Sequence, residues 1–286
     1  MGTPLAHRTA AVLLTWTALC SMPWHGALAQ PASGSGSVAA VSPVAIDRLA
    51  AIDMAGRQRM LAQRMTKAWM QRMLGVDAGQ AQAVLQASME RFESQLASLR
   101  PASADSASSA AWTEMQAQWR GFQALLAQPG GRAIAGELYD ASEALQRAAH
   151  NATLAHDRAG GPPLEHLVNL AGRQRMLSQR MAKFYLYRAA DVLADPAEME
   201  LHLSRAHFTA VLLQIERSPH VGAAVRDAVL RVRQQWTPYE QALFTHRDPA
   251  RMRAGAARVA SGSERVLAAL EDLVALIVAE GRGASR

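Results

Sequence analysis

The sequence predicts an all-α protein made of two tandem antiparallel four-helix bundles that form a pseudo-dimer. Three observations support this fold class. The composition after residue 43 is rich in Ala, Leu, Gln, Arg and Met and poor in aromatic residues, which favours helices. Glycine and proline positions divide the chain into segments of helical length. One stretch of sequence also occurs twice, which marks a duplicated structural unit.

The N-terminal segment, residues 1–29, is predicted to be a secretory signal peptide that is cleaved after Ala29. Arg8 precedes a short apolar segment, which ends at a small-residue cleavage site and is too short to span a membrane. The only cysteine, Cys20, lies here, so the mature chain would have no disulfide and no thiol ligand. Lipidation of Cys20 is the alternative. Residues 30–43 are rich in Gly and Ser and are predicted to be a flexible linker, so we expect a periplasmic protein.

The first bundle is predicted to cover residues 44–158. Gly75, Pro101 and the Pro129-Gly130-Gly131 run separate its helices, and a Ser/Ala-rich stretch at 102–109 is expected to be a loop. The expected helices cover residues 44–74, 78–99, 110–127 and 134–155.

The second bundle is predicted to cover residues 164–281 and to follow a Gly-Gly-Pro-Pro break at 160–163. The last helix is apolar on more than one side but is too short to span a bilayer, so we expect a core helix and no transmembrane span in the mature chain. The expected helices cover residues 164–193, 197–217, 221–244 and 249–279.

The repeated stretch aligns without a gap and differs at two positions only, where Ala62 corresponds to Ser178 and Thr66 to Ala182. The two copies are Ala55-Gly56-Arg57-Gln58-Arg59-Met60-Leu61-Ala62-Gln63-Arg64-Met65-Thr66-Lys67 and Ala171-Gly172-Arg173-Gln174-Arg175-Met176-Leu177-Ser178-Gln179-Arg180-Met181-Ala182-Lys183.

On a helix, Arg59 and Arg175 each fall on a stripe of otherwise small or apolar side chains, which predicts that this stripe is buried. A buried guanidinium is costly to desolvate unless it meets an anion. The nearest acid of the first copy, Asp53, corresponds to the neutral Asn169 of the second. We therefore expect an anion from outside the chain to complete the site. The alternative is that the arginines extend to the rim or pair with a glutamate of another helix, such as Glu90, Glu114 or Glu143.

The pattern Ala-Gly-x-x-Arg-Met-x-x-x-Arg, which both copies carry, resembles the helix-one signature of the PilJ/NarX-like sensor domain. That domain is the periplasmic four-helix input domain of nitrate/nitrite sensor kinases and of type IV pilus methyl-accepting chemotaxis transducers. The signature sequence of this chain is closer to the pilus-transducer form. The resemblance implies that Arg59 and Arg175 bind nitrate where two first helices meet. Arg64 and Arg180 match the second arginine of the signature.

The short linker between the bundles can place the two first helices parallel and side by side, so that one chain imitates a parallel dimer. We expect Arg59 and Arg175 to face each other across a pseudo-twofold axis and to share one anion pocket. The net charge of +6 favours anionic ligands, but export and interspersed acids argue against nucleic acid. No nucleophile elbow, phosphate-binding glycine loop or His-Glu-x-x-His motif occurs, so we expect no catalytic site, no cofactor and no metal.

We therefore predict an exported, non-enzymatic sensor-type protein that binds a small oxyanion, nitrate or nitrite first, and relays the signal to a separate membrane sensor kinase, chemoreceptor or transporter. Arg59 and Arg175 would supply bidentate hydrogen bonds, and Gly56 and Gly172 would permit close helix approach. The other candidate residues would raise the local potential or pair with acids at the rim; they are Arg57, Arg64, Arg173 and Arg180. The alternative is an envelope interaction or scaffold protein with no small-molecule ligand.

Overall fold

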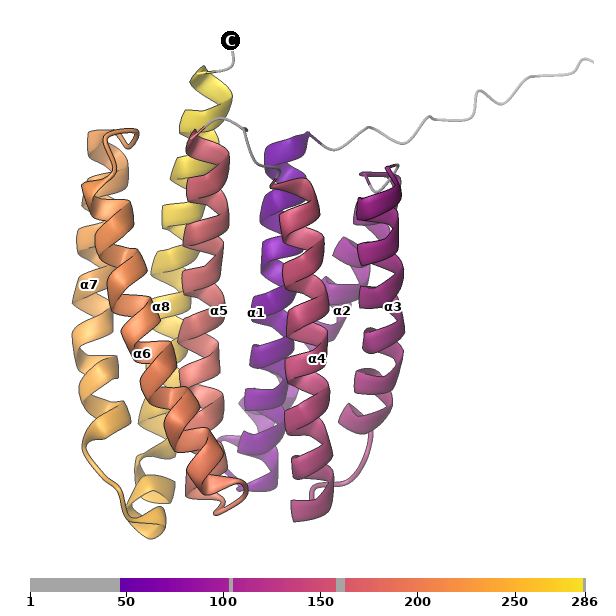
Figure 1. Cartoon of the computed structure of the whole chain (residues 1–286). Coiled ribbons are helices and arrows are strands. Elements are labelled where there is room, and N and C mark those ends of the chain that lie inside the picture. The colour runs from indigo at the N-terminus through magenta and orange to yellow at the C-terminus, as the bar shows by residue number, and fades with distance from the viewer. Residues whose placement is uncertain (1–46, 103–104, 158–162, 285–286) are drawn as a thin grey trace, which may run out of the picture. The chain divides into compact units, whose positions relative to one another are not determined.

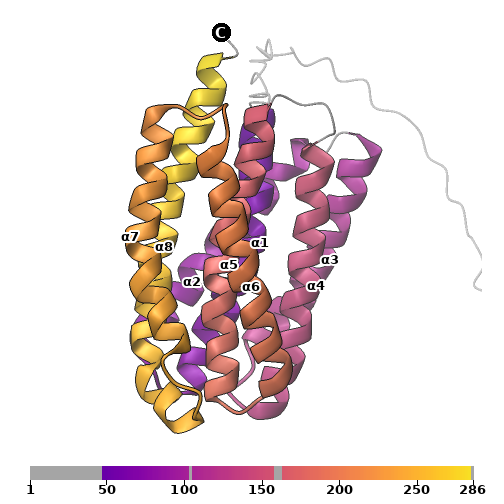
Figure 2. The same ribbon diagram turned by 60° about the vertical axis from the view of Figure 1, so that its left-hand side comes forward.

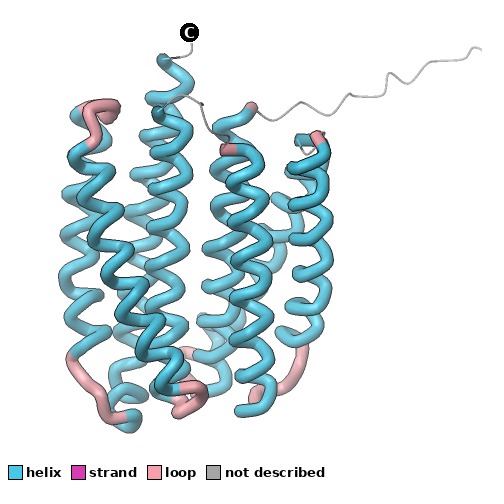
Figure 3. The backbone as a smooth tube through the Cα atoms, viewed as in Figure 1, coloured by secondary structure: helices cyan, strands magenta, loops and turns pink. Residues whose placement is uncertain are grey.

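Helices account for the regular structure of the described part of the chain, in which no β-strand occurs (Figure 3). The computed structural model describes residues 47–102, 105–157 and 163–284. The predicted all-α class with tandem helical bundles is confirmed. The predicted signal peptide, the linker and Cys20 lie outside the described residues. The helices are α1 (Arg48–Met73), α2 (Ala78–Ala102), α3 (Ser106–Leu126), α4 (Arg132–His156), α5 (Pro163–Ala189), α6 (Ala194–Arg217), α7 (Ala223–Phe244) and α8 (Pro249–Ala284).

Several helix ends differ from the expected boundaries by up to five residues, and the start of α3 is one of them. The sequence prediction placed a loop at 102–109, but α3 already begins at Ser106. The side chain of Asp105 accepts hydrogen bonds from the backbone N–H groups of Ala107 and Ser108, at 3.1 and 3.0 Å. This cap satisfies donors that the first turn leaves without a helical partner, so a Ser/Ala-rich segment can start a helix.

The connections after α1 and α5 use the same backbone geometry. Gly75 and Asp77 have φ angles of 69° and 45°, and Asp191 and Leu193 have φ angles of 54° and 45° at the corresponding positions. This left-handed backbone conformation is energetically costly for residues other than Gly, Asn or Asp. The repeat therefore extends from the signature helix into the turn that follows it, and Leu193 adopts this conformation without a favourable side chain.

The first helices of the two repeats, α1 and α5, pack against each other along their length (Figures 1 and 2). They run in the same direction, because Asp53 and Lys67 of α1 meet Arg175 and Gln179 of α5 in the same order. Each also packs against helices of its own repeat, α1 on α2 and α4, and α5 on α6 and α8. As a result, α1 and α5 are buried on nearly every side.

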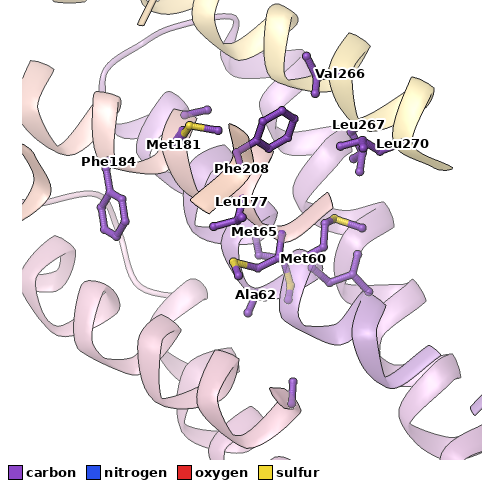
Figure 4. Close-up of a cluster of buried hydrophobic side chains, with 14 of the residues drawn as sticks. Met60, Ala62, Met65, Leu177, Met181, Phe184, Phe208, Val266, Leu267 and Leu270 are labelled. Atoms are coloured by element: carbon purple, nitrogen blue, oxygen red, sulfur yellow. The ribbon is translucent and has the colours of Figure 1, made fainter. Parts of the chain in front are cut away.

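The apolar core runs through both repeats and across the α1–α5 contact. Figure 4 shows Met60 and Met65 of α1 in the same cluster as Leu177 and Met181 of α5. Equivalent aromatic pairs stack within each repeat, with ring centroids 4.3 Å apart for Phe92 and Trp119 and 4.2 Å apart for Phe208 and Trp236. Most methionines and tryptophans of the repeats thus serve as core residues, whereas Met199 is 59 % exposed.

The last helix, α8, contributes buried side chains to this core, as expected for it; among them are Val266, Leu270, Leu273, Val274 and Ile277. None of the helices within the described residues is both long and apolar enough to cross a bilayer. All described residues belong to one compact unit, so the two repeats share a packed interface. The bundle boundaries 44–158 and 164–281 stay a prediction.

Candidate functional site

The two signature arginines lie at the α1–α5 interface, with 1 % of Arg59 and none of Arg175 exposed. Both guanidinium groups approach Gly172. A Cβ atom added to this glycine would lie 3.3 Å from Nη2 of Arg175 and 3.4 Å from Nη2 of Arg59. A Cβ atom on Gly56 would lie 3.1 Å from Nη2 of Arg59. Glycine at these positions therefore leaves the space that the guanidinium groups occupy.

Arg175 is neutralised from within the chain. Its Nη2 donates to Oδ1 of Asp53 in α1 at 2.6 Å, and its Nη1 donates to Oε2 of Glu271 in α8 at 3.0 Å. The expectation that neither arginine has a counter-ion in the chain is therefore wrong for Arg175. Both carboxylates come from other helices, and neither the acid of the other repeated stretch nor Glu271 was expected as a partner. The glutamates suggested as partners, at positions 90, 114 and 143, do not pair with it.

Arg59 has different partners. Its Nε donates to the carbonyl oxygen of Gly56 at 3.3 Å and its Nη2 to the carbonyl oxygen of Asn169 at 3.2 Å. Its Nη1 lies 3.2 Å from Nδ1 of His150, and because a guanidinium only donates, this ring nitrogen accepts. No carboxylate pairs with Arg59 in the part of the chain that the structure describes. Arg59 is thus a buried cation whose hydrogen-bond partners are all uncharged.

The surroundings shift the pKa values of the two arginines in opposite directions. Burial, and then the charges of Arg173 and Arg175, lower the pKa of Arg59 to about 9, although Asp157 counteracts them. Burial also opposes ionisation of Arg175, but Asp53 and Glu271 outweigh it and raise its pKa. Both groups are protonated at neutral pH. The positive charge is therefore stabilised at Arg175 and disfavoured at Arg59.

The arginines two positions earlier differ in the same way. Arg57 is buried and pairs with Asp53 at 3.0 Å and with Glu271 at 2.8 Å. Its counterpart Arg173 is exposed and has no ion pair among the described residues. Arg173 lines a cavity of about 190 Å³ between α4, α5 and α6, in which Arg180, Glu200 and His207 are the other lining residues that can carry a charge. On the Arg59 side of the interface, neither Arg59 nor Arg173 thus forms an ion pair among the described residues, and Asp157, whose charge acts on Arg59, accepts a hydrogen bond from Asn169 instead, at 2.6 Å.

The second arginines of the signature form ion pairs, one of the two roles expected for them. Arg64 binds both carboxylate oxygens of Glu264, with Nη2 to Oε2 at 2.6 Å and Nε to Oε1 at 3.1 Å. Arg180 pairs with Glu143 and Glu200, each at 2.7 Å. Their charges are therefore balanced within the chain.

Two lysines at the interface were not among the sequence candidates. Lys67 and Lys183 end the two repeated stretches and are fully buried, with 1 % and 0 % exposed. Lys67 of α1 reaches Glu264 of α8, and Lys183 of α5 donates to Glu143 of α4 at 2.6 Å. Each lysine thus pairs with a glutamate of the other repeat. Their presence in both copies of a mostly buried stretch was the signal that could have identified them.

These pairs affect the ionisation of their members. Burial opposes the charge of Glu143, but Lys183 and Arg180 outweigh it and lower its pKa to about 2. For Lys183, burial outweighs the attraction of Glu143 and lowers the pKa to about 8. The ion pairs connect the repeats at the end of the signature, beyond the two arginines.

Comparison with known proteins gave one family. The profile of the family described as type IV pili methyl-accepting chemotaxis transducer N-term matches residues 49–153 and residues 164–269. The two matches begin in α1 and α5 and contain both signature stretches. No curated protein and no solved structure matches the chain.

Proposed function

The chain belongs to the family of type IV pili methyl-accepting chemotaxis transducer N-terminal domains, in two tandem copies, and from this premise we propose that it senses a small planar oxyanion at Arg59. The family's domain is a sensory, signal-transducing one. Nitrate and nitrite are the first candidates, because they are planar anions that a guanidinium binds through two parallel hydrogen bonds. We propose no catalytic activity.

The observation that carries this proposal is the uncompensated charge of Arg59. A guanidinium has five N–H donors, and the acceptors of Arg59 in the described part of the chain are the carbonyl oxygens of Gly56 and Asn169 and one nitrogen of His150. A buried charge that has no counter-ion destabilises the folded protein by several kcal/mol. A bound anion offsets this cost, and the free energy gained appears as affinity.

We propose that an anion reaches Arg59 at His150. This imidazole is half-buried and contacts Nη1 of Arg59, so an anion that displaces the ring would take its place on the guanidinium. The charge of Arg173 acts on both Arg59 and His150, which favours an anion at this point further. The helix α4, which carries His150, would then respond to the ligand.

The remaining parts of the proposal concern the cellular role. We propose that the protein is exported to the periplasm and that ligand binding changes how it docks on a separate membrane sensor kinase, chemoreceptor or transporter. The parallel α1–α5 contact supports the idea that the chain imitates a dimer of single-copy sensor domains. Movement of α4 or α8 relative to this contact would carry the signal.

The internal pairing of Arg175 favours the second candidate, an envelope interaction or scaffold protein without a small ligand. In that case Asp53 and Glu271 show how the fold compensates its arginines, and Arg59 is tolerated as a buried cation. The two candidates differ in whether anions stabilise the protein.

Thermal unfolding with increasing nitrate, nitrite and chloride tests the proposal. A ligand at 100 times its Kd stabilises the folded state by about 2.7 kcal/mol, which is readily measured. We expect stabilisation by nitrate or nitrite beyond that by chloride, and its loss in Arg59→Gln. The matched control is Arg188→Gln, which removes the same charge from a buried arginine paired with Glu198 near the end of α5. Equal effects of all three salts, or an unchanged nitrate effect in Arg59→Gln, would exclude anion sensing at Arg59.

A further inference from the structure

Equivalent residues of the two repeats can be paired from their contacts. The amide Nε2 of Gln58 donates to the carbonyl oxygen of Phe92 at 3.1 Å, and Nε2 of Gln174 donates to the carbonyl oxygen of Phe208 at 2.8 Å. The first two helices of each repeat therefore pack in the same register. Arg59 and Arg175, which follow these glutamines, occupy equivalent places.

The last helices, α4 and α8, can be matched in the same way. Glu143 of α4 accepts a hydrogen bond from the lysine of the second repeat, and Glu264 of α8 accepts one from the lysine of the first. About two helical turns further along, α4 carries His150 and α8 carries Glu271. Both side chains contact a signature arginine through its Nη1 atom. His150 and Glu271 are therefore equivalent positions.

The equivalent surroundings of the two arginines differ in charge. The residue on the facing first helix is Asp53 at Arg175 but Asn169 at Arg59, and the residue on the last helix is Glu271 at Arg175 but His150 at Arg59. Both carboxylates of one site are thus replaced by neutral groups in the other. The arginine itself is present in both.

We propose that Asp53 and Glu271 act as built-in anions that fill the Arg175 site permanently, so that the chain binds a single external anion, at Arg59. This inference rests on the proposed function and adds its stoichiometry and ligand class. A carboxylate offers a guanidinium the same planar pair of oxygens as nitrate. Because carboxylates are what the equivalent arginine binds, small carboxylates such as formate belong to the ligand class of Arg59 together with nitrate.

Charge distinguishes the two arginine sites. An anion at Arg175 would meet Asp53 and Glu271, two like charges already hydrogen-bonded to the same guanidinium, and would be repelled. At Arg59 the same two positions hold an amide residue and an imidazole, and the carboxylate whose charge acts on Arg59, Asp157, is hydrogen-bonded to the amide of Asn169 and not to the guanidinium. We call the Arg175 copy, whose guanidinium is hydrogen-bonded to two carboxylates, the closed site, and the Arg59 copy, whose guanidinium is hydrogen-bonded to none, the open site.

Two reciprocal exchanges test this inference by titration calorimetry with nitrate and with formate, in a buffer free of other planar anions. The filled variant, His150→Glu/Asn169→Asp, gives Arg59 the carboxylates of the closed site. The emptied variant, Asp53→Asn/Glu271→His, gives Arg175 the neutral partners of the open site. We expect one anion for the wild type, two for the emptied variant, and an affinity weakened by roughly a hundredfold or more in the filled variant.

The control for added negative charge is Gln86→Glu/Gln128→Glu, at two exposed positions away from the α1–α5 interface, which should bind like the wild type. Unchanged affinity in the filled variant, two anions in the wild type, or one anion in a folded emptied variant would each overturn the inference while the proposed function stands. If the emptied variant does not fold, the filled variant decides alone. A wild type that binds neither nitrate nor formate overturns the proposed function, and this inference with it.

Discussion

Replacing the two signature arginines by methionine should have unequal effects on stability, although the two residues are equally buried. Arg175→Met removes the cation that holds Asp53 and Glu271, whose side chains are 19 % and 27 % exposed. Breaking a buried ion pair typically costs about 3–5 kcal/mol. Arg57 still pairs with both carboxylates and solvent reaches them in part, so we expect a loss of about 2–3 kcal/mol.

Arg59→Met removes hydrogen bonds to neutral acceptors, each of which contributes about 1 kcal/mol. It also removes a charge that burial and two neighbouring arginines disfavour, as the lowering of the Arg59 pKa to about 9 indicates. That relief is on the order of a few kcal/mol. The two contributions oppose each other, so we expect stability within about 1 kcal/mol of the wild type in an anion-free buffer.

Urea or thermal unfolding of both variants measures the difference. For a chain of this size, about 2–4 °C of melting temperature corresponds to 1 kcal/mol, so Arg175→Met should melt roughly 4–12 °C lower and Arg59→Met close to the wild type. Met is a suitable replacement because it is flexible and can fill the space of the arginine stem. If Arg59→Met is destabilised as much as Arg175→Met, Arg59 is compensated in the folded protein and the argument for an external anion fails.

Three further outcomes are expected. Burial and the charges of Arg59 and Arg173 lower the pKa of His150 below its ordinary 6.5, so the unfolded chain takes up the proton first and stability should fall as the pH falls below about 6.5, less so in His150→Gln. Lys183→Met removes one of the two cations that pair with Glu143, the other being Arg180, and should cost about 2–3 kcal/mol in urea unfolding. Glu143→Gln should restore part of this loss in the double variant, because Arg180 still pairs with Glu200. Leu193→Gly should raise the melting temperature, because relieving a left-handed leucine that is 42 % exposed gains about 1 kcal/mol.

Each of these outcomes has a control. If the stability of His150→Gln falls with pH as steeply as that of the wild type, a group other than His150 causes the loss. A double variant at Lys183 and Glu143 no more stable than Lys183→Met would show that charge pairing is not what the lysine provides. Leu193→Ala keeps a side chain at the left-handed position and should gain much less than Leu193→Gly, so equal gains would point to a cause other than backbone strain.

Local sequence signals predicted most of the helices but not their ends. The run at 102–109 has loop composition, yet Asp105 starts α3 there because a side-chain cap outweighs a weak helical propensity. The core role of α8 followed from its apolar pattern, which fixes the buried face whatever the partner helix is. Such features depend on residues close in sequence, and for this reason they can be predicted without coordinates.

The sequence by itself determined that a helical unit is duplicated and that each copy places an arginine among buried side chains. It even contained the difference between Asp53 and Asn169, but a helix pattern relates a residue only to neighbours three or four positions away. Tertiary packing decided that Asp53 serves the arginine of the other copy and that Glu271 and His150 complete the two surroundings. Ion pairs form between groups that are close in space, whatever their separation in the sequence. For this reason only the packed helices show that Arg175 pairs with carboxylates and that Arg59 does not.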